Sequence, residues 1–201
     1  MTKPSLILAS SSPRRREILE AIGLVFTVRT VAVDESSRQG EPAADMVVRL
    51  AAAKATSIAL DAGQIIIGAD TAVVLGDEVF GKPADSDDAL RMLSGLSGQT
   101  HQVMTGVAVV GSKGLKTVLS VTDVRFRIIS VDEARCYWKS GEPRDKAGAY
   151  AIQGRGGVFV EAIMGSYTGV VGLPVFETAC LLRDAGLETL PTELPKPLSG
   201  V

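Results

Sequence analysis

Side chains that bind metals or form cross-links through sulfur or imidazole are scarce in this chain. Its 201 residues include only two cysteines and one histidine. Cys136 and Cys180 lie far apart and show no metal-ligand spacing, so we expect both to be buried, reduced packing residues of a cytoplasmic protein. His101 lies at the start of a predicted strand, and the sequence has no recognisable nucleophile elbow that would supply a serine partner for it. The pattern therefore gives no support to a Ser/His/Asp triad and indicates a structural role for His101.

The chain also has few aromatic residues, no long apolar run and no large excess of charge of one sign. No apolar segment is long enough to span a bilayer, and the first is too short for a signal peptide. The net charge of −2 does not suggest a nucleic acid or an anionic membrane as a partner. Aromatic residues make up 4% of the chain, whereas Ala, Val, Ile, Leu and Gly dominate, which is typical of α/β layers. Neither a Walker A motif nor a Rossmann fingerprint is present.

The most informative stretch is a serine-rich turn followed by three arginines, residues 10–16. It comes after the apolar run 6–9, which predicts a short buried strand, and Ser12 and Pro13 suit the N-cap and first position of a helix. Three cations at a helix N-terminus repel the macrodipole and one another, an arrangement that becomes favourable when an anion binds at the turn. The alternative is a solvated basic surface. The surrounding strand–Ser–Ser–Pro–Arg pattern favours a phosphate site, with Arg16 alone facing solvent.

Helical and strand patterns alternate along the rest of the chain. Helices are predicted over residues 13–23, 42–60, 86–96, 131–139 and 174–185, and strands over 25–33, 65–70, 72–75, 79–80, 102–110, 116–129 and 158–163. This order predicts an α/β or α+β fold, a mixed twisted sheet with flanking helices. We expect one domain over residues 1–190 and a loosely ordered, Pro-rich tail over 191–201.

A carboxylate closes the apolar strand 65–69. Asp70 either marks the edge of this strand or lines a ligand crevice, which in α/β sheets forms at strand ends. Thr71 and the downstream Gly81–Lys82–Pro83 favour the crevice, because they bring a carboxylate and an ammonium out of neighbouring strands. A carboxylate beside bound phosphate needs a divalent cation or a proton, so a metal is implied.

Two further charged residues have two interpretations each. Lys54 lies on the apolar side of helix 42–60, where a lysine either extends to solvent or reaches into a site. Glu35 follows a predicted strand and is either a solvated acid or a second carboxylate that handles the metal.

A glycine-rich segment, residues 148–154, carries polar side chains suited to a ligand. Glycine allows the backbone to approach a ligand closely, and Lys146, Tyr150 and Arg155 lie in or beside the segment. Gln153 can present both a donor and an acceptor to the edge of a nucleobase.

Taken together, these motifs resemble the Maf proteins over most of the chain, from Leu6 to about Leu182. The matching stretches, in the same order, are residues 9–15, 34–35, 54–55, 68–71, 81–83, 96–101, 105–106, 141–143, 145–148, 165–167 and 171–174. Maf proteins are nucleoside triphosphate pyrophosphatases, once described as septum-formation inhibitors. The resemblance implies a fold similar to that of inosine triphosphatase, with a nucleotide cleft between two lobes, a Mg²⁺ or Mn²⁺ cofactor and a homodimer.

The resemblance also implies roles for individual residues. Asp70 matches the catalytic acid, which acts as general base, and Glu35 matches an acid near the metal that Asp70 helps to hold. Positions that match triphosphate-binding residues are Ser10, Arg14, Arg15, Lys54 and Lys82. Positions that resemble the branch of the family acting on dTTP and UTP are Arg14, Thr71 and Gln153 within Ala151–Gly154.

The implied reaction is hydrolysis between the α and β phosphates, which gives a nucleoside monophosphate and pyrophosphate. Two rival functions stay open on the sequence. One is a pyrophosphatase for modified nucleotides such as methylated pyrimidine triphosphates. The other is a nucleotide- or nucleic-acid-binding regulator of cell division without catalysis, although Asp70 and the low net charge argue against it.

Overall fold

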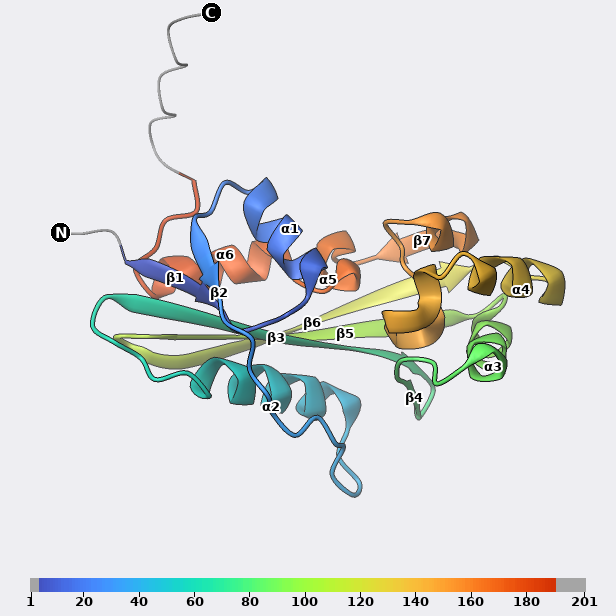
Figure 1. Cartoon of the computed structure of the whole chain (residues 1–201), viewed down its shortest axis with the longest axis horizontal. Helices are drawn as coiled ribbons and strands as arrows, with labels where there is room; N and C mark the ends of the chain where they lie inside the picture. Colours follow the sequence, from blue (N-terminus) through green and yellow to red (C-terminus); the bar gives the residue numbers. More distant parts are fainter. Residues whose placement is uncertain (1–3, 191–201) are drawn as a thin grey trace, which may run out of the picture.

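The computed structural model describes residues 4–190, and the predicted tail 191–201 lies outside this range. In this range the chain forms a seven-stranded mixed sheet in the order β2-β1-β3-β5-β6-β7, with β4 paired to β3 (Figure 1). The strands are β1 Ser5–Leu8, β2 Phe26–Val28, β3 Gln64–Leu75, β4 Glu78–Phe80, β5 Thr100–Gly111, β6 Gly114–Phe126 and β7 Val160–Met164. β1 pairs parallel with β2 and β3, and the other pairings are antiparallel. The predicted mixed sheet is confirmed.

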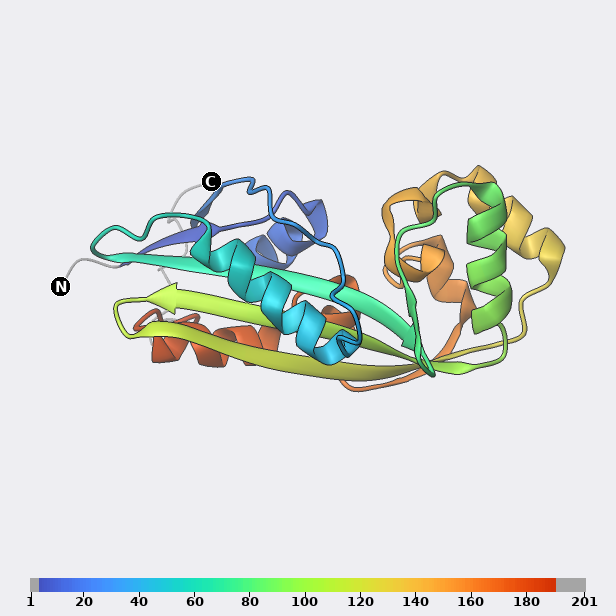
Figure 2. The same ribbon diagram turned by 90° about the horizontal axis from the view of Figure 1, so that it is seen from below.

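Helices cover both faces of this sheet at one end of the molecule. The α-helices of the described residues are α1 Pro13–Ala21, α2 Ala43–Thr56, α3 Ser86–Leu96, α4 Val131–Lys139, α5 Tyr167–Val171 and α6 Val175–Asp184. α1, α5 and α6 lie on one face and α2 lies on the other (Figure 1). α3 and α4 form a separate group at the far end, and the long strands β3, β5 and β6 run between the two groups (Figure 2). None of the helices in residues 4–190 is both long and apolar enough to cross a membrane.

The sequence specifies several helix ends locally. The side chain of Asp85 accepts a hydrogen bond from the N–H of Asp88 and caps α3. Ser130 and Glu133 form a reciprocal capping box at the start of α4. Such caps satisfy N–H groups that have no partner inside the helix, so these boundaries fall where the sequence predicts them.

α2 lies unusually close to the sheet because two glycines face it. A Cβ atom on Gly68 of β3 would lie 2.3 Å from the carbonyl oxygen of Ala51, and one on Gly106 of β5 would lie 2.4 Å from that of Val47. Neither position has room for a side chain. This close approach brings Lys54, on the last turn of α2, against β3.

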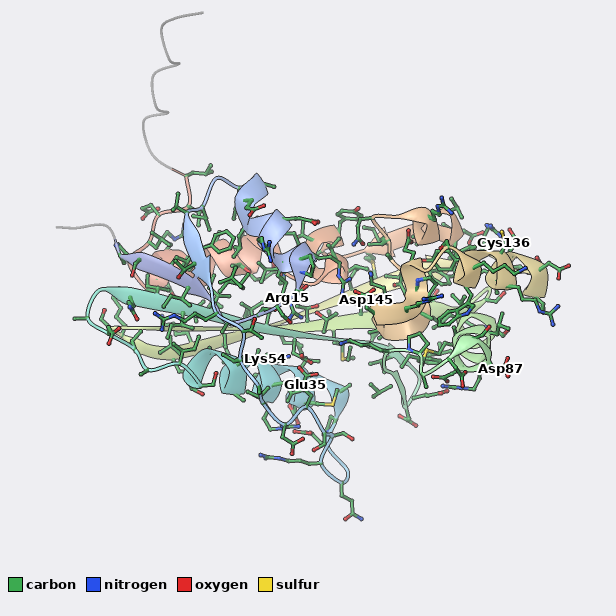
Figure 3. All side chains as sticks on the ribbon, viewed as in Figure 1. Arg15, Glu35, Lys54, Asp87, Cys136 and Asp145 are labelled. Carbon is green, nitrogen blue, oxygen red and sulfur yellow. The ribbon has the colours of Figure 1, made fainter. Side chains whose placement is uncertain are left out.

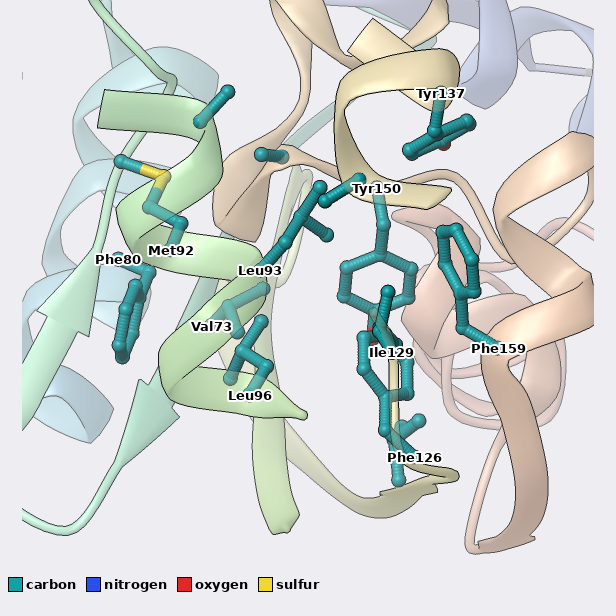
Figure 4. Close-up of a cluster of buried hydrophobic side chains, with 14 of the residues drawn as sticks. Val73, Phe80, Met92, Leu93, Leu96, Phe126, Ile129, Tyr137, Tyr150 and Phe159 are labelled. Carbon is teal, nitrogen blue, oxygen red and sulfur yellow. The ribbon is translucent and has the colours of Figure 1, made fainter. Parts of the chain in front are cut away.

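The apolar core follows the same division into two ends. At the sheet end, α1 and α6 pack on β1, β3 and β5 through residues such as Leu19, Ile67 and Leu182. The far-end cluster joins α3, α4 and the segments after α4 (Figure 4), and its larger members include Phe80, Leu93, Phe126, Tyr137, Tyr150 and Phe159. Each end therefore has its own packed interior.

Several local predictions are wrong. The predicted strand 25–33 pairs with β1 only over Phe26–Val28. The predicted break at Asp70 is absent, since β3 runs unbroken from Gln64 to Leu75. Cys136 is exposed and Cys180 half-buried, both as free thiols, rather than buried. α5 and the 3₁₀ segments Glu142–Asp145, Ala147–Ala149 and Arg155–Phe159 were not predicted.

The edge of β3 that pairs with β1 and β4 has a gap in its strand pairing where the sequence of β3 becomes polar. β1 pairs with Gln64–Ile67, and β4 pairs with Val73–Leu75 on the same edge, because β5 occupies the other edge from Ile66 to Val74. Residues 68–72 of β3 therefore have no neighbouring strand on this side. The gap lies at the carboxyl end of β1, where the connections leave for opposite faces of the sheet, the usual place for a ligand crevice.

Candidate active site

A cavity of about 520 Å³ opens at the gap in the edge of β3. Residues from both ends of the molecule line it. The residues for which catalytic, metal or nucleotide-binding roles were predicted are all among them: Ser10, Arg14, Arg15, Glu35, Lys54, Asp70, Thr71, Lys82 and Gln153. Arg155 of the glycine-rich segment is not. The structure therefore brings into one cavity side chains that are up to 143 positions apart, from Ser10 to Gln153.

The floor of the cavity holds a lysine between two carboxylates. Lys54 Nζ lies 2.6 Å from Asp70 Oδ1 and 2.6 Å from Glu35 Oε1. Lys54 is 7% exposed, so of the two interpretations of this residue the structure supports the one in which it reaches into the site. The hydrogen bond from Lys54 holds the pKa of Glu35 below its usual value. Lys54, Glu35 and Arg15 lie close together in Figure 3.

Arg15 is buried beside this group, and each of its three guanidinium nitrogens donates one hydrogen bond. Its Nε donates to the carbonyl of Gly172 at 2.9 Å, and its two terminal nitrogens donate to Ser10 Oγ at 3.2 Å and Thr71 Oγ1 at 3.3 Å. Burial lowers the pKa of Arg15 from its ordinary value, and Asp70 opposes this shift. Guanidinium stays charged in proteins, so Arg15 places a fixed positive charge at the cavity wall.

Thr71 supports Arg15 through a chain of hydroxyl groups. Its Oγ1 lies 3.0 Å from Thr105 Oγ1, which donates to the carbonyl of Gly169 at 2.8 Å. Thr105 is completely buried. The hydroxyl of Thr71 is thus held between Arg15 and Thr105, a connection that the sequence did not reveal.

Arg14 reaches across the cavity to the far end of the molecule. Its Nη1 lies 3.4 Å from Oδ2 of Asp145, which is also paired with Lys146. Burial tends to raise the pKa of Asp145, but the hydrogen bond from Lys146 and the nearby cations hold it below its usual value. Asp145 lies in the stretch 145–148 that matches the Maf proteins, but no role was predicted for it in the cavity that it lines. Arg16 is exposed, as predicted.

The N-terminus of α1 faces this cavity without a side-chain cap. Ser12 occupies the N-cap position with extended backbone but makes no capping hydrogen bond, and its own N–H donates to Ser10 Oγ at 3.2 Å. Pro13 has no N–H to satisfy. Helix N-termini of this kind favour an anion, both through their dipole and through their N–H groups.

The opposite wall comes from the glycine-rich segment and from Lys82. Lys82 and Gln153 are both exposed at the cavity. Tyr150 also lines the cavity, but its hydroxyl lies 2.9 Å from Nε2 of the buried His101. His101 therefore has the structural place predicted for it.

The acidic residues of the floor suit a metal only in part. In residues 4–190 no group of three or more His, Cys, Asp or Glu side chains is arranged to hold a metal ion. Glu35 and Asp70 nevertheless converge on one point, now occupied by the ammonium of Lys54. Mg²⁺ in nucleotide sites often binds one or two carboxylates and takes its other ligands from phosphates and water. Two carboxylates fit that pattern.

A cleft lined by fixed cations, a helix N-terminus and paired carboxylates defines a protein that binds a phosphorylated, polyanionic ligand. The sequence model of the family described as Maf-like protein matches residues 5–185. The chain belongs to the Maf family, and the resemblance drawn from its motifs is confirmed.

Similar curated proteins carry a more specific description. A dTTP/UTP pyrophosphatase from Hahella chejuensis is 49% identical over 187 residues, which are 91% of this chain and 93% of that protein. One from Anaeromyxobacter dehalogenans is 50% identical over 196 residues, 96% of this chain and 99% of that protein. One from Methylococcus capsulatus is 50% identical over 187 residues, 92% of each.

Proposed function

We propose that this protein hydrolyses dTTP and UTP to the nucleoside monophosphate and pyrophosphate. The observation that carries the proposal is the single cavity in which the Lys54–Asp70 pair lies between a cationic wall and a wall that carries Gln153. The names of relatives about half identical over more than nine-tenths of the chain support the same substrates. Non-catalytic regulation of cell division is not favoured, because it gives no role to a buried lysine–carboxylate pair.

The cationic wall binds the triphosphate. Arg15 supplies a charge fixed by its hydrogen bonds, Arg14 exchanges Asp145 for a phosphate oxygen, and Lys82 adds a mobile point charge. The uncapped N-terminus of α1 and the hydroxyl of Ser10 contribute donors. These groups stabilise the charge that grows on the phosphates as the bond breaks.

Asp70 acts as the general base. Lys54 holds one carboxylate oxygen of Asp70, and the other accepts a proton from a water molecule. The oxygen of that water forms a bond to the α-phosphorus while the bond from this phosphorus to the oxygen bridging the β phosphate breaks. The electron pair leaves with pyrophosphate, whose charge Lys54 and the arginines stabilise.

Glu35 and Asp70 are the residues that would hold a divalent cation, Mg²⁺ or Mn²⁺, together with phosphate oxygens. Such a cation supplies charge neutralisation and polarises the phosphates when it is bound. Because the Lys54 ammonium now lies between these two carboxylates, it would have to move aside for the cation and would add a further positive charge to the site.

Base selection belongs to Gln153, with Arg14 and Thr71 acting on the nucleotide from the other wall. The amide of Gln153 can pair with the edge of thymine or uracil, since it offers both a donor and an acceptor. Methylated pyrimidine triphosphates are the alternative substrates within this class. A single catalytic domain over residues 1–190, a homodimer and a cytoplasmic location are parts of the same proposal.

The test is product analysis with a panel of canonical and methylated triphosphates in Mg²⁺ or Mn²⁺. We expect monophosphate and pyrophosphate from dTTP and UTP, and about 10²–10⁴-fold slower turnover by Asp70→Asn with nucleotide binding retained. Release of diphosphate and inorganic phosphate would contradict the proposal. Salt-dependent DNA binding without pyrophosphate release would favour the regulator instead.

A further inference from the structure

The segment that presents Gln153 is held by side chains rather than by a strand ladder. Gln153 lies between Ala151 and the 3₁₀ segment that begins at Arg155, and it is exposed at the cavity. The segment's internal backbone hydrogen bonds are few, one joining the N–H of Gly154 to the carbonyl of Ala151 at 3.2 Å. Its shape must therefore come from elsewhere.

Tyr137 of α4 supplies the first of these contacts. Its hydroxyl accepts a hydrogen bond from the N–H of Ala151 at 3.0 Å and donates one to Glu142 Oε1 at 2.7 Å. The residue is 6% exposed, and its ring packs edge-to-face on Phe159 with centroids 5.1 Å apart (Figure 4). Burial, and then the hydrogen bond to Glu142, raise the pKa of Tyr137 well above its ordinary value, so the hydroxyl stays protonated.

Glu142 supplies the other contacts. Its two carboxylate oxygens accept hydrogen bonds from the N–H groups of Arg155 and Gly156, each at 3.0 Å. Burial opposes ionisation of Glu142, but the hydrogen bonds from Tyr137 and these two amides prevail, and its pKa lies below the usual value. Tyr137 and Glu142 thus hold three backbone N–H groups, one before Gln153 and two after it.

Two glycines of the segment are explained by the same contacts. A Cβ atom on Gly154 would lie 2.4 Å from Glu142 Oε2, and one on Gly156 would lie 2.5 Å from the Tyr137 hydroxyl. Neither glycine has the positive φ that would require glycine by itself. The Gly154–Arg155–Gly156 run, which fits no nucleotide fingerprint, lets the backbone approach Tyr137 and Glu142.

We propose that Tyr137 and Glu142 are positioning residues for base recognition: they fix the backbone on both sides of Gln153 and so aim its amide at the nucleobase. This inference rests on the proposed function, in which Gln153 reads the base. It adds two residues that touch no substrate atom. Tyr137 belongs to α4 and to the far-end cluster, so the shape of the base-reading segment depends on the packing of that cluster.

The experiment compares kcat/KM for UTP and for CTP, because uracil and cytosine differ mainly in the donor and acceptor that an amide reads. The variants are Tyr137→Phe, which keeps the buried ring, Glu142→Gln, Gln153→Ala and the double variant Tyr137→Phe/Gln153→Ala. The matched control is Tyr167→Phe, which removes a hydroxyl from a tyrosine that is 46% exposed.

We expect Tyr137→Phe and Glu142→Gln each to lower the UTP/CTP ratio of kcat/KM about tenfold, mainly through KM for UTP, the size of one misplaced hydrogen bond. In the Gln153→Ala background, adding Tyr137→Phe should change the ratio by less than about twofold, because the two changes act on one interaction. Tyr167→Phe should leave the ratio unchanged.

A purely structural role gives a different result. If Gln153→Ala lowers the ratio but Tyr137→Phe and Glu142→Gln reduce only the melting temperature, the positioning role is wrong and base reading by Gln153 stands. If Gln153→Ala leaves the ratio unchanged, both the positioning role of Tyr137 and Glu142 and base reading by Gln153 are wrong. Should Tyr137→Phe fail to fold, Glu142→Gln decides, since it keeps the volume of the side chain and one acceptor oxygen.

Discussion

Lys54 Nζ lies 2.6 Å from Asp70 Oδ1, although one residue belongs to a helix and the other to the middle of a strand. The contact exists because α2 lies directly on the sheet, where Gly68 of β3 and Gly106 of β5 leave no side chain in between. The ion pair at the floor of the cavity therefore depends on how closely α2 packs against the sheet.

Replacing Lys54 with methionine should lower kcat by about 100-fold or more, the usual cost of one lost charge-stabilising group. Methionine keeps much of the length and apolar stem but leaves Glu35 and Asp70 facing a polyanion without their cation. Without its hydrogen bond from Lys54, Glu35 should also regain a pKa nearer its ordinary value, which carboxyl NMR titration would detect. Lys116→Met, which removes an exposed lysine paired with Asp184, is the control and should retain full activity. Equal activity in both variants would contradict the role of Lys54.

Adding one methyl group at Gly68 should destabilise the fold. The new Cβ would lie 2.3 Å from Ala51 O and 2.6 Å from Ala55 N, so α2 must shift, at a cost of about 1–3 kcal/mol. Because Lys54 moves with α2, activity at a temperature where the variant is folded should fall as well. Gly95→Ala is the matched control: its Cβ would make an ordinary 3.6 Å contact with Phe80, and an alanine inside α3 should stabilise by about 0.5–1 kcal/mol. Urea unfolding should show a lower free energy of unfolding for Gly68→Ala and a higher one for Gly95→Ala than for the unchanged protein.

Thr71→Val should weaken phosphate binding by way of Arg15. Valine keeps the shape of threonine but gives no acceptor to the guanidinium and no partner to Thr105. We expect KM for dTTP and UTP to rise about three- to tenfold, and inhibition by inorganic tripolyphosphate, which has no base, to weaken by a similar factor. A change confined to the ratio between bases, with tripolyphosphate inhibition unaltered, would instead mean that Thr71 contacts the base directly.

Stability should depend on pH through His101. Burial lowers the pKa of His101 from 6.5 to about 4, so between these values the unfolded chain binds a proton that the folded chain does not. The free energy of unfolding should therefore rise with pH across this window, and acidification from pH 6.5 toward 4 should remove on the order of 3 kcal/mol. Urea midpoints at pH 7 and pH 5 test this. His101→Gln, which cannot titrate, should show a smaller difference, and an unchanged difference would assign the effect to other groups.

The parts of the fold that the sequence predicts are those with local causes. The caps at Asp85 and Ser130 fix the starts of α3 and α4 through contacts three residues away, and a Gly–Ser–Lys–Gly turn joins β5 to β6 in a hairpin. The strand 25–33 is shorter than predicted because its length is set by β1, a partner with only four residues. β3 continues through Asp70 because β5 pairs with it on the other edge, which no local pattern reveals.

The site residues that the sequence predicts likewise have local causes. Arg14, Arg15, Lys54 and Asp70 were found because a charged side chain is unusual in the segment that holds it. Asp145, Thr105 and Glu142 lie in stretches that match the Maf proteins but were given no role, because their contacts are with residues distant in sequence or with backbone groups. Cys136 was placed inside because cysteine is usually buried, but its position on α4 faces away from Ala134 and Tyr137, the buried residues of that helix.

The uninterrupted run of β3 past the gap in its edge determines what the cavity can accept. The phosphate wall follows β1, which pairs as far as Ile67, and the opposite wall begins where β4 pairs at Val73. The span between them is a stretch of strand rising ~3.3 Å per residue, paired along its other edge with β5. A hinge at this point would have to break the β3–β5 ladder. In the proposed function, β3 therefore sets the separation between the wall that binds the phosphate chain and the wall that reads the base.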